Sequence, residues 1–438
     1  MGAAFMSSRS LPLINPFAGR SSSMPRKTSP ISRRRFLAAG ALAAPLIVSE
    51  RVLGLNNTVS PSNRLVCVMI GIGNRGGETL LPFAQLPDFY MLGVCDCYKA
   101  HAQEGKDRLD ALFGNHDAMI FPKYEDVLER SDVDVVICTT PDHWHTKIIV
   151  ESCKAGKDVF SEKPLTLTLA EGRMVVKAAR MYNRVVSSGS QRVMEDYGKL
   201  APIVQAGDIG EVKEIFCGVG GPPSQAYLPE EEIPEGMDWN RWQGQAPWMP
   251  YNHERCSGSY GGGWRAIYEY GNGFLADWGA HKFGGAVYAC GLDGEEPVKV
   301  LQPHSGGNET DFMTVEYANG VQLHHAPEYD ITIVGSEGTI HTGNAWQTVP
   351  SRVVDIRRYH GALEEIRADA AWSFKHRVRP FQDVQFGANT AAICQLLHIG
   401  YQVKRDLVWD SANTRFIGDD EANRLVSRVQ RAPYTIEI

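Results

Sequence analysis

The sequence lacks a hydrophobic run long enough to cross a membrane as a permanent anchor. The Ala-rich apolar stretch at residues 38–48 is shorter than the roughly 20 residues that a spanning helix needs. No internal repeat or low-complexity segment stands out either. We therefore expect a globular chain without stable membrane insertion.

Cysteine and metal-ligand patterns are also missing. The nine cysteines are an odd number, and Cys67, Cys95 and Cys138 fall in segments expected to be buried strands. A buried free cysteine acts as a small apolar side chain, so no disulfide framework is expected. No carboxylate or cysteine cluster with ligand spacing accompanies His143 and His145. We therefore predict no metal site.

Acidic residues are absent from the first 48 positions, which carry seven arginines and lysines. Subtracting those seven charges from the formal net charge of −7 leaves a body of about −14. An acidic body argues against nucleic acid and against an anionic membrane surface as partners.

The basic end has the order of an export signal. Residues 32–37, SRRRFL, resemble a twin-arginine motif, and the short apolar stretch 38–48 follows. We expect residues 1–60 to be a twin-arginine signal peptide and linker, and the protein to be periplasmic or otherwise exported. A basic disordered tail is the alternative.

The chain does contain a glycine-rich turn after an apolar run. Leu65–Ile70 suits a strand buried on both faces, and Gly71, Gly73 and Gly76 follow at G-x-G-x-x-G spacing. Gly71 permits a tight turn, Gly73 lets the backbone approach a pyrophosphate, and Gly76 lets the next helix pack close to the strand. The first amides of that helix would point at the phosphates. The pattern predicts a dinucleotide site, although glycine-rich turns are common.

Asp96 strengthens this interpretation. It ends a second apolar run, 90–95, about 20 residues after Gly76, where a carboxylate accepts hydrogen bonds from an adenosine ribose. Because a carboxylate there repels a 2′-phosphate, NAD is expected rather than NADP. An aspartate that only caps the turn after the strand is the alternative.

Apolar runs alternate with helix-like segments up to residue 188. Strands are expected at 65–70, 90–95, 118–121, 133–138, 157–160 and 185–187, and helices at 100–113, 124–129, 147–155 and 169–182. This alternation predicts a doubly wound parallel sheet, that is, a Rossmann domain over residues 64–188. Ligands of such sheets bind outside the carboxyl ends of the strands, where the motifs lie.

The pattern changes near Gly189. A helical stretch at 193–205 precedes segments that alternate like antiparallel strands (211–219, 309–316, 321–325 and 331–334), and a late helix lies within 379–403. Residues 237–279 are too long for a plain connection, so a functional loop is expected there. Residues after 403 look polar and irregular. The predicted fold class is α/β: an N-terminal doubly wound Rossmann domain, then an α+β domain over residues 189–438 with a large, mainly antiparallel sheet.

Four segments together resemble the Gfo/Idh/MocA oxidoreductase family, which includes glucose–fructose oxidoreductase and inositol dehydrogenases. They are residues 68–76, the turn 139–145, Glu162-Lys163-Pro164 and the stretch from Asp277 to His281. The resemblance implies NAD(P) along the glycine turn, Lys163 between nicotinamide and substrate, and Asp277 and His281 facing a sugar. The cofactor-binding residues that it implies are Gly71, Ile72, Gly73, Asn74, Arg75, Gly76, Asp96, Thr139, Thr140, Pro141, His145, Glu162, Lys163 and Gln191.

The residue chemistry agrees. Oxidation of a secondary alcohol requires a base, positive potential at the developing alkoxide and a hydride acceptor held close. Lys163 follows a strand and can supply the positive potential. Asp277 and His281 are four residues apart and would share one helix face, where Asp277 can orient the imidazole and His281 can take the proton. A solvated surface lysine, a helix-surface ion pair and a satisfied core histidine are the alternatives.

Substrate contacts are expected from nearby cationic and aromatic side chains. Trp239, Trp242, Trp248, Trp264 and Trp278 lie near the candidate site in sequence; one or two could stack on a sugar, while most would pack the loop. The candidate substrate-binding residues are Lys163, Arg192, Trp264, Arg265, Asp277 and His281.

Three functions follow from these observations. The first is an exported NAD-dependent oxidoreductase acting on a secondary hydroxyl of a sugar, glycoside or cyclitol. Since soluble NAD is not expected outside the cytoplasm, its cofactor would be bound tightly and recycled in place. The second is a redox-neutral glycosidase that oxidises, eliminates, hydrates and reduces; the third is a non-catalytic sugar- or cofactor-binding protein. The resemblance also implies a homodimer or homotetramer.

Overall fold

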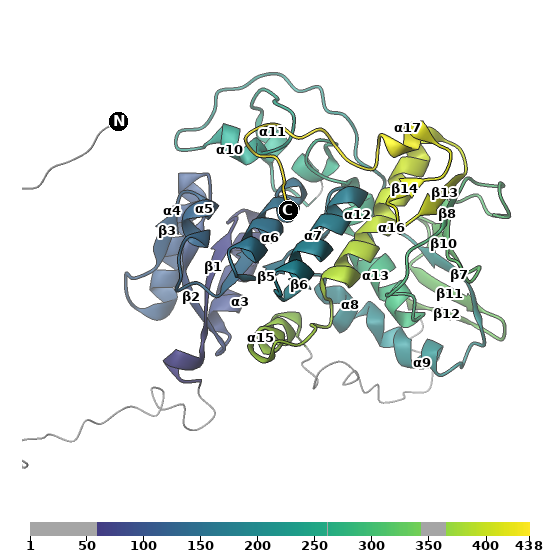
Figure 1. The fold of residues 1–438 in the computed structure, drawn as a ribbon, viewed down its shortest axis with the longest axis horizontal. Coiled ribbons are helices and arrows are strands. Elements are labelled where there is room, and N and C mark those ends of the chain that lie inside the picture. The colour runs from purple at the N-terminus through teal and green to yellow at the C-terminus, as the bar shows by residue number, and fades with distance from the viewer. Residues whose placement is uncertain (1–58, 261, 343–364) are drawn as a thin grey trace, which may run out of the picture.

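The computed structural model describes residues 59–260, 262–342 and 365–438. Residues 1–58, most of the predicted signal peptide and linker, lie outside the described residues. The described chain forms two sheets with helices packed against them (Figure 1).

The first sheet has six strands in the order β3-β2-β1-β4-β5-β6, and every neighbouring pair is parallel. Its strands are β1 (Leu65–Ile70), β2 (Phe89–Cys95), β3 (Met119–Phe121), β4 (Val135–Cys138), β5 (Asp158–Ser161) and β6 (Val186–Ser188). The helices between them are α3 (Asn74–Gln85), α4 (Lys99–Phe113), α5 (Tyr124–Leu128), α6 (Asp142–Lys154) and α7 (Leu169–Met181). The predicted doubly wound sheet is confirmed.

Burial on both faces explains these apolar strands. Leu80 of α3 and Leu109 of α4 belong to one apolar cluster, and Ile148 of α6 and Val175 of α7 belong to another. All four residues of β4 are buried between the two. Helices on both sides therefore leave the carboxyl edge of the sheet as the place where polar side chains can gather.

The second sheet has eight strands in the order β12-β11-β7-β10-β9-β8-β13-β14. They are β7 (Val212–Cys217), β8 (Lys299–Leu301), β9 (Thr314–Glu316), β10 (Gln322–His325), β11 (Ile331–Gly335), β12 (Thr339–His341), β13 (Leu407–Asp410) and β14 (Arg415–Phe416). Only the β7–β10 pair is parallel among the described pairs of this sheet, so the expected mainly antiparallel sheet is confirmed. Helices α13 (Gly279–Ala289) and α16 (Val384–Val403) share its apolar core.

Several predicted boundaries were wrong for local reasons. Helix α6 begins at Asp142, not at residue 147, directly after Pro141 at its N-cap. The helical stretch at 193–205 is broken into α8 (Gln191–Glu195), a 3₁₀ turn (Tyr197–Leu200) and α9 (Ala201–Gln205). At Gly198, a Cβ atom would lie 2.2 Å from the carbonyl oxygen of Val193, so only glycine fits this break.

The end of the chain is more regular than predicted. Helix α16 starts at Val384 because the Asp383 carboxylate accepts a hydrogen bond from the Phe386 N–H at 3.2 Å. The prediction of an irregular segment after residue 403 was wrong, since β13, β14 and α17 (Asp420–Asn423) follow. Strands of only two to four residues are too short to show alternation of apolar and polar residues in the sequence.

Late segments return to the first sheet. Helix α15 (Ile366–His376) places Ala370 and Phe374 in the cluster on the α3 side, and Tyr434 and Ile436 join the cluster on the α6 side. Lys147 of α6 donates a hydrogen bond to the Thr435 carbonyl at 3.0 Å. The core of the first sheet is thus completed by residues from far along the chain, and the division at residue 188 stays a prediction.

The long segment 237–279 has structure of its own. It contains α10 (Trp239–Gln243), α11 (His253–Cys256), a 3₁₀ turn (Gly263–Ala266) and α12 (Gly273–Asp277). Asp238 N–H donates to the Cys97 carbonyl at 2.9 Å, and Arg241 pairs with Glu125 at 2.8 Å, so this segment lies across the carboxyl edge of the first sheet. None of the helices in the described ranges is both long and apolar enough to span a membrane.

Candidate active site

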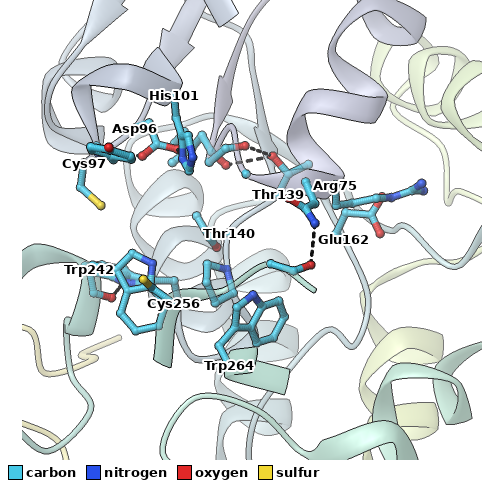
Figure 2. A pocket seen from close by; sticks show the side chains of 18 of the residues that line it. Arg75, Asp96, Cys97, His101, Thr139, Thr140, Glu162, Trp242, Cys256 and Trp264 are labelled. Carbon is cyan, nitrogen blue, oxygen red and sulfur yellow. Dashed lines mark hydrogen bonds and ion pairs between the residues drawn. The ribbon is translucent and has the colours of Figure 1, made fainter. Parts of the chain in front are cut away.

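A cavity of about 500 Å³ lies between the carboxyl edge of the first sheet and the segment 237–279. Figure 2 shows Asp96, Cys97 and His101 toward one end, Arg75 and Glu162 toward the other, and Thr140 between them. The predicted site residues that line it are Gly71, Gly73, Asn74, Arg75, Asp96, Thr139, Thr140, Pro141, Glu162, Lys163, Gln191, Arg192, Trp264, Arg265, Asp277 and His281.

The geometry of the three glycines is compatible with the roles that their spacing predicts. Gly71 has φ +93°, and a Cβ on Gly76 would lie 2.0 Å from the Gly71 carbonyl oxygen. Gly73 lines the cavity, and no atom lies within 4 Å of the position that its Cβ would take. The backbone at Gly73 is therefore accessible from the cavity beside the first turn of α3, and a pyrophosphate could approach it closely there.

Asp96 fixes the turn after β2 and also faces the cavity, so the ribose contact stays a prediction. Its Oδ2 accepts the Ile72 N–H at 2.7 Å and its Oδ1 accepts the Tyr98 N–H at 2.8 Å, which fixes the glycine turn and the start of α4. It also lines the cavity, and each oxygen retains a lone pair for a ribose hydroxyl. Its interaction with His101, whose Nδ1 lies 3.8 Å from Asp96 Oδ2, raises the pKa of that imidazole above its usual value and outweighs the opposite effect of burial.

Three predicted cofactor residues are not among the cavity-lining residues of the described chain: Ile72, Gly76 and His145. Ile72 points its side chain into the apolar core. His145 is buried, with Nδ1 2.8 Å from the Pro164 carbonyl oxygen and Nε2 2.8 Å from the Thr140 carbonyl oxygen. It therefore holds the two backbone segments that carry Thr140 and Lys163 instead of facing a ligand.

Lys163 and Asp277 meet across the cavity from opposite parts of the chain. Lys163 Nζ lies 2.6 Å from Asp277 Oδ1, and Arg265 Nε lies 3.3 Å from the same oxygen. Burial alone would raise the pKa of Asp277, but the two cations outweigh it and hold that pKa below its usual value. The carboxylate is ionised and fixes the ammonium group of Lys163 in place.

His281 is oriented by a residue that the sequence did not point to. Its Nδ1 lies 2.7 Å from Ser190 Oγ, whose hydroxyl donates to the Ala280 carbonyl at 2.8 Å. Because the hydroxyl proton is used there, Nδ1 carries the imidazole proton and Nε2 keeps its lone pair. Burial, with the charges of Lys163 and Arg192 adding to it, holds the pKa of His281 well below 6.5, so the ring is neutral.

Asp277 and His281 do not lie on one continuous helix. Asp277 ends α12 and His281 lies in the first turn of α13, and the two helices meet at Trp278. The imidazole partner is Ser190, and Asp277 orients Lys163. The prediction that Asp277 orients the imidazole therefore differs from the hydrogen bonds of this structure.

Asp142 lies buried at the start of α6. Its Oδ1 has no hydrogen-bond partner among the described residues. Burial, together with the negative charge of Asp277, raises the pKa of Asp142 to about 8. This carboxyl group is therefore largely protonated at neutral pH.

Three of the five tryptophans, Trp242, Trp264 and Trp278, line the cavity, whereas Trp248 is exposed outside it. Trp239 stacks on Trp242 with ring centroids 4.9 Å apart, which packs the loop. Stacking on a sugar stays a prediction. Within the described ranges, no group of three or more His, Cys, Asp or Glu side chains is placed to hold a metal ion.

The sequence also gave no sign of a second set of contacts over the glycine turn. Asn74 Nδ2 donates to the Gly258 carbonyl at 2.8 Å, and the Tyr260 hydroxyl donates to Glu78 at 2.7 Å. We call residues 253–260 the strap. It closes the cavity above the turn, and its only sequence signal was the unusual length of the segment around it.

Comparison with known sequences supports the same architecture. Residues 65–190 match the model of the Gfo/Idh/MocA oxidoreductase family for its NAD-binding Rossmann fold, and residues 221–436 match the model for its C-terminal alpha/beta domain. An alpha-N-acetylgalactosaminidase of Shewanella oneidensis is 30% identical over 173 residues, 34% of this chain and 37% of that protein. A glycosyl hydrolase family 109 protein of Shewanella baltica is 31% identical over 176 residues, again 34% and 37%. The alignments thus span little more than a third of these relatives.

Solved structures share the fold over most of the chain. An aldose–aldose oxidoreductase from Caulobacter crescentus has a TM-score of 0.55 at 16% identity, covering 79% of this chain and 100% of that one. A myo-inositol 2-dehydrogenase from Lactobacillus plantarum has a TM-score of 0.52 at 17% identity, covering 79% and 100%. With both family models matched in order and an NAD site built on the first sheet, this chain belongs to the Gfo/Idh/MocA oxidoreductase family.

Proposed function

We propose that this protein oxidises a secondary hydroxyl of a sugar, glycoside or cyclitol with NAD. The observation that carries the proposal is the meeting of Lys163 with Asp277, 2.6 Å apart, and of a neutral His281 in the same cavity as the glycine turn. A held ammonium group and an unprotonated ring nitrogen are the two groups that alcohol oxidation requires from a protein.

The residues present fit NAD. Gly73 offers an open backbone shelf for the pyrophosphate, and Asp96 lines the end of the cavity that follows β2. Gln191 lines the other end, and its buried Oε1 has no partner in the described chain, so it can accept a hydrogen bond from a carboxamide. When bound, NAD⁺ supplies the hydride acceptor.

The chain's own residues would handle the hydroxyl. Nε2 of His281 accepts the hydroxyl proton, because Ser190 holds the other nitrogen protonated. Lys163 stabilises the negative charge that develops on the oxygen, and Asp277 keeps the ammonium group in position. Removal of the proton and stabilisation of the oxygen thus come from two different parts of the chain that line one cavity.

The strap supports a cofactor that stays bound between turnovers. Its two hydrogen bonds, from Asn74 to Gly258 and from Tyr260 to Glu78, lie over the glycine turn and would have to open before a dinucleotide leaves. Retention suits the proposed export by the twin-arginine route, since a folded protein could then carry NAD out of the cytoplasm. Cell fractionation tests the export, and size-exclusion chromatography tests the proposed homodimer or homotetramer.

A redox-neutral glycosidase is the second candidate, and the names of the curated relatives favour it. These are an alpha-N-acetylgalactosaminidase and glycosyl hydrolase family 109 proteins. The same site would then oxidise the sugar, allow elimination of the aglycone, and return the hydride after water is added. Cleavage of chromogenic glycosides without added NAD would favour this candidate, whereas net ketose formation without cleavage would favour the first.

The decisive experiment begins with the nucleotide that the purified protein releases on denaturation. We expect NAD in near one-to-one amount, and we expect a panel of sugars to change its redox state or to be cleaved. Lys163→Met should lower kcat by about 10³-fold or more while the nucleotide content stays unchanged. The matched control is Lys299→Met, because Lys299 lies on β8 and pairs with Glu316 outside the cavity. Unaltered turnover by Lys163→Met would refute the proposal.

A further inference from the structure

The end of the cavity that follows β5 and β6 carries more positive than negative charge. Arg75, Lys163, Arg192 and Arg265 line it, and the acids among them are Glu162 and Asp277. A third lining acid, Glu78, is more than half exposed and is bound by Tyr260. Asp96 follows β2, three strands away from β5.

Three of the four cations are already partnered. Arg75 Nε donates to Glu162 Oε1 at 2.7 Å, and Lys163 and Arg265 share Asp277. Arg192 is different: its described ion-pair partner is Asp196, 3.1 Å away, and both side chains are more than 40% exposed. A solvent-exposed pair of this kind is weak and easily exchanged for another anion.

Arg192 is nevertheless held close to the reacting groups. Its guanidinium carbon lies 5.2 Å from the centre of the Trp278 ring, which in turn lies 5.8 Å from the His281 ring. The charge of Arg192 also contributes to the low pKa of His281, after burial and Lys163. The guanidinium group of Arg192 thus lies over the ring of Trp278, next to the proposed base His281.

The cofactor's phosphates cannot account for this charge. They would bind at the glycine turn after β1, whereas Arg192 follows β6, and β4 and β5 lie between. Three strand spacings of about 4.8 Å place the two points roughly 14 Å apart. The charge of Arg192 is therefore available to a substrate anion in exchange for its exposed pair with Asp196.

We infer that the substrate is an acidic sugar, and that Arg192 binds its carboxylate while Trp278 contacts the apolar face of the ring. The inference rests on the proposed function and names its substrate class. A guanidinium binds a planar carboxylate through two parallel hydrogen bonds, and aromatic rings stack on sugars. A sulfate ester on the sugar would offer related anionic chemistry, but without the planar match.

Paired substrates test the inference on the full-length protein with its own cofactor. Glucose and glucuronate, galactose and galacturonate, and galactose 6-sulfate are compared by kcat/KM. We expect the kcat/KM of each uronate to exceed that of its neutral partner by about 10-fold or more, and Arg192→Gln to lower this uronate-to-neutral ratio by about 10-fold or more. Arg192→Lys should recover part of the loss.

Two further variants sharpen the result. Asp196→Asn removes the anion that competes for Arg192, so uronate KM should fall by up to about 5-fold. Arg415→Gln is the control, since Arg415 lies on β14 and pairs with Asp410 away from the cavity. If Arg192 had only a structural role, Asp196→Asn would not lower the KM for the uronate.

Calorimetric titration separates failure of this inference from failure of the proposed function. Uronate binding that Arg192→Gln abolishes supports the inference even if no sugar is turned over, and in that case only the oxidoreductase proposal fails. Equal turnover and equal binding of neutral and acidic sugars would overturn it, as would a uronate preference that survives in Arg192→Gln. Stronger binding of the sulfated sugar than of the uronates would overturn the carboxylate assignment.

Discussion

Replacing Ser190 with alanine tests the role of the proposed base, His281, without replacing His281 itself. The Ser190 hydroxyl is buried, accepts the proton of His281 Nδ1 at 2.7 Å and donates to the Ala280 carbonyl. In Ser190→Ala the Nδ1–H group loses its acceptor. The imidazole can then move its proton to Nε2, which removes the lone pair that the mechanism needs.

The size of the effect follows from the cost of a buried donor without a partner. That cost is about 1–3 kcal/mol, and each 1.4 kcal/mol changes a rate about tenfold. We therefore expect kcat to fall by about 5- to 150-fold. Because Ser190 is not among the cavity-lining residues, KM and nucleotide content should change little.

The pH profile provides a second measurement. The low pKa of His281 places the acid limb of kcat/KM below pH 6.5 in the wild type, because the ring is protonated only below its lowered pKa. Ser190 also stabilises the protonated ring by accepting from Nδ1. Its loss should therefore move the acid limb to still lower pH.

Ser373→Ala is the matched control, because its hydroxyl is buried in α15 and has no hydrogen-bond partner within the described chain. The reasoning would be refuted if Ser190→Ala kept the wild-type kcat and acid limb, or if both serine variants lost the same activity. Thermal unfolding of the two variants shows whether a loss of stability contributes.

Three other predictions address the cofactor site and its surroundings. Gly73→Ala should keep the wild-type free energy of unfolding within about 1 kcal/mol but lose bound NAD. Gly76→Ala should be destabilised, because its Cβ would lie 2.0 Å from the Gly71 carbonyl oxygen. Denaturant titration measures the stability of both variants, and nucleotide release on denaturation measures their bound NAD. The pKa of Asp142 is about 8 in the folded state and near 3.8 in the unfolded state, so the native state binds more protons. The free energy of unfolding should therefore fall as pH rises between these values, by up to about 1.4 kcal/mol per pH unit. Asp142→Asn should flatten this slope in unfolding curves at several pH values, and an unchanged slope would contradict the assignment. Tyr260→Phe removes the hydrogen bond to Glu78 and should speed NAD release into a scavenging enzyme by about 2- to 10-fold, while an unchanged release rate would rule out the strap as a barrier.

The first sheet could be predicted from the sequence because parallel strands buried on both faces are written as uninterrupted apolar runs. Leu65–Ile70 and the glycine spacing after it show this directly, and the carboxyl-edge rule then placed Asp96, Thr140 and Lys163 in one cavity. The α6 boundary failed because a proline followed by an acid resembles a turn until the helix behind it is known.

The part of the site that lies outside the first sheet could be predicted from the sequence less well. Ser190 follows a strand as many loop serines do, and only the fold brings it to His281. The four-residue spacing of Asp277 and His281 suggested one helix face, yet the break at Trp278 turns Asp277 toward Lys163. Strap contacts such as Asn74 to Gly258 join residues 184 positions apart, which no local pattern records.

The return of Tyr434 and Ile436 to α6 has a consequence for biosynthesis. While a ribosome is still making the second sheet, the nucleotide-binding half has an uncovered apolar flank where these side chains will later sit. Its final packing therefore waits until Tyr434 and Ile436 have been translated.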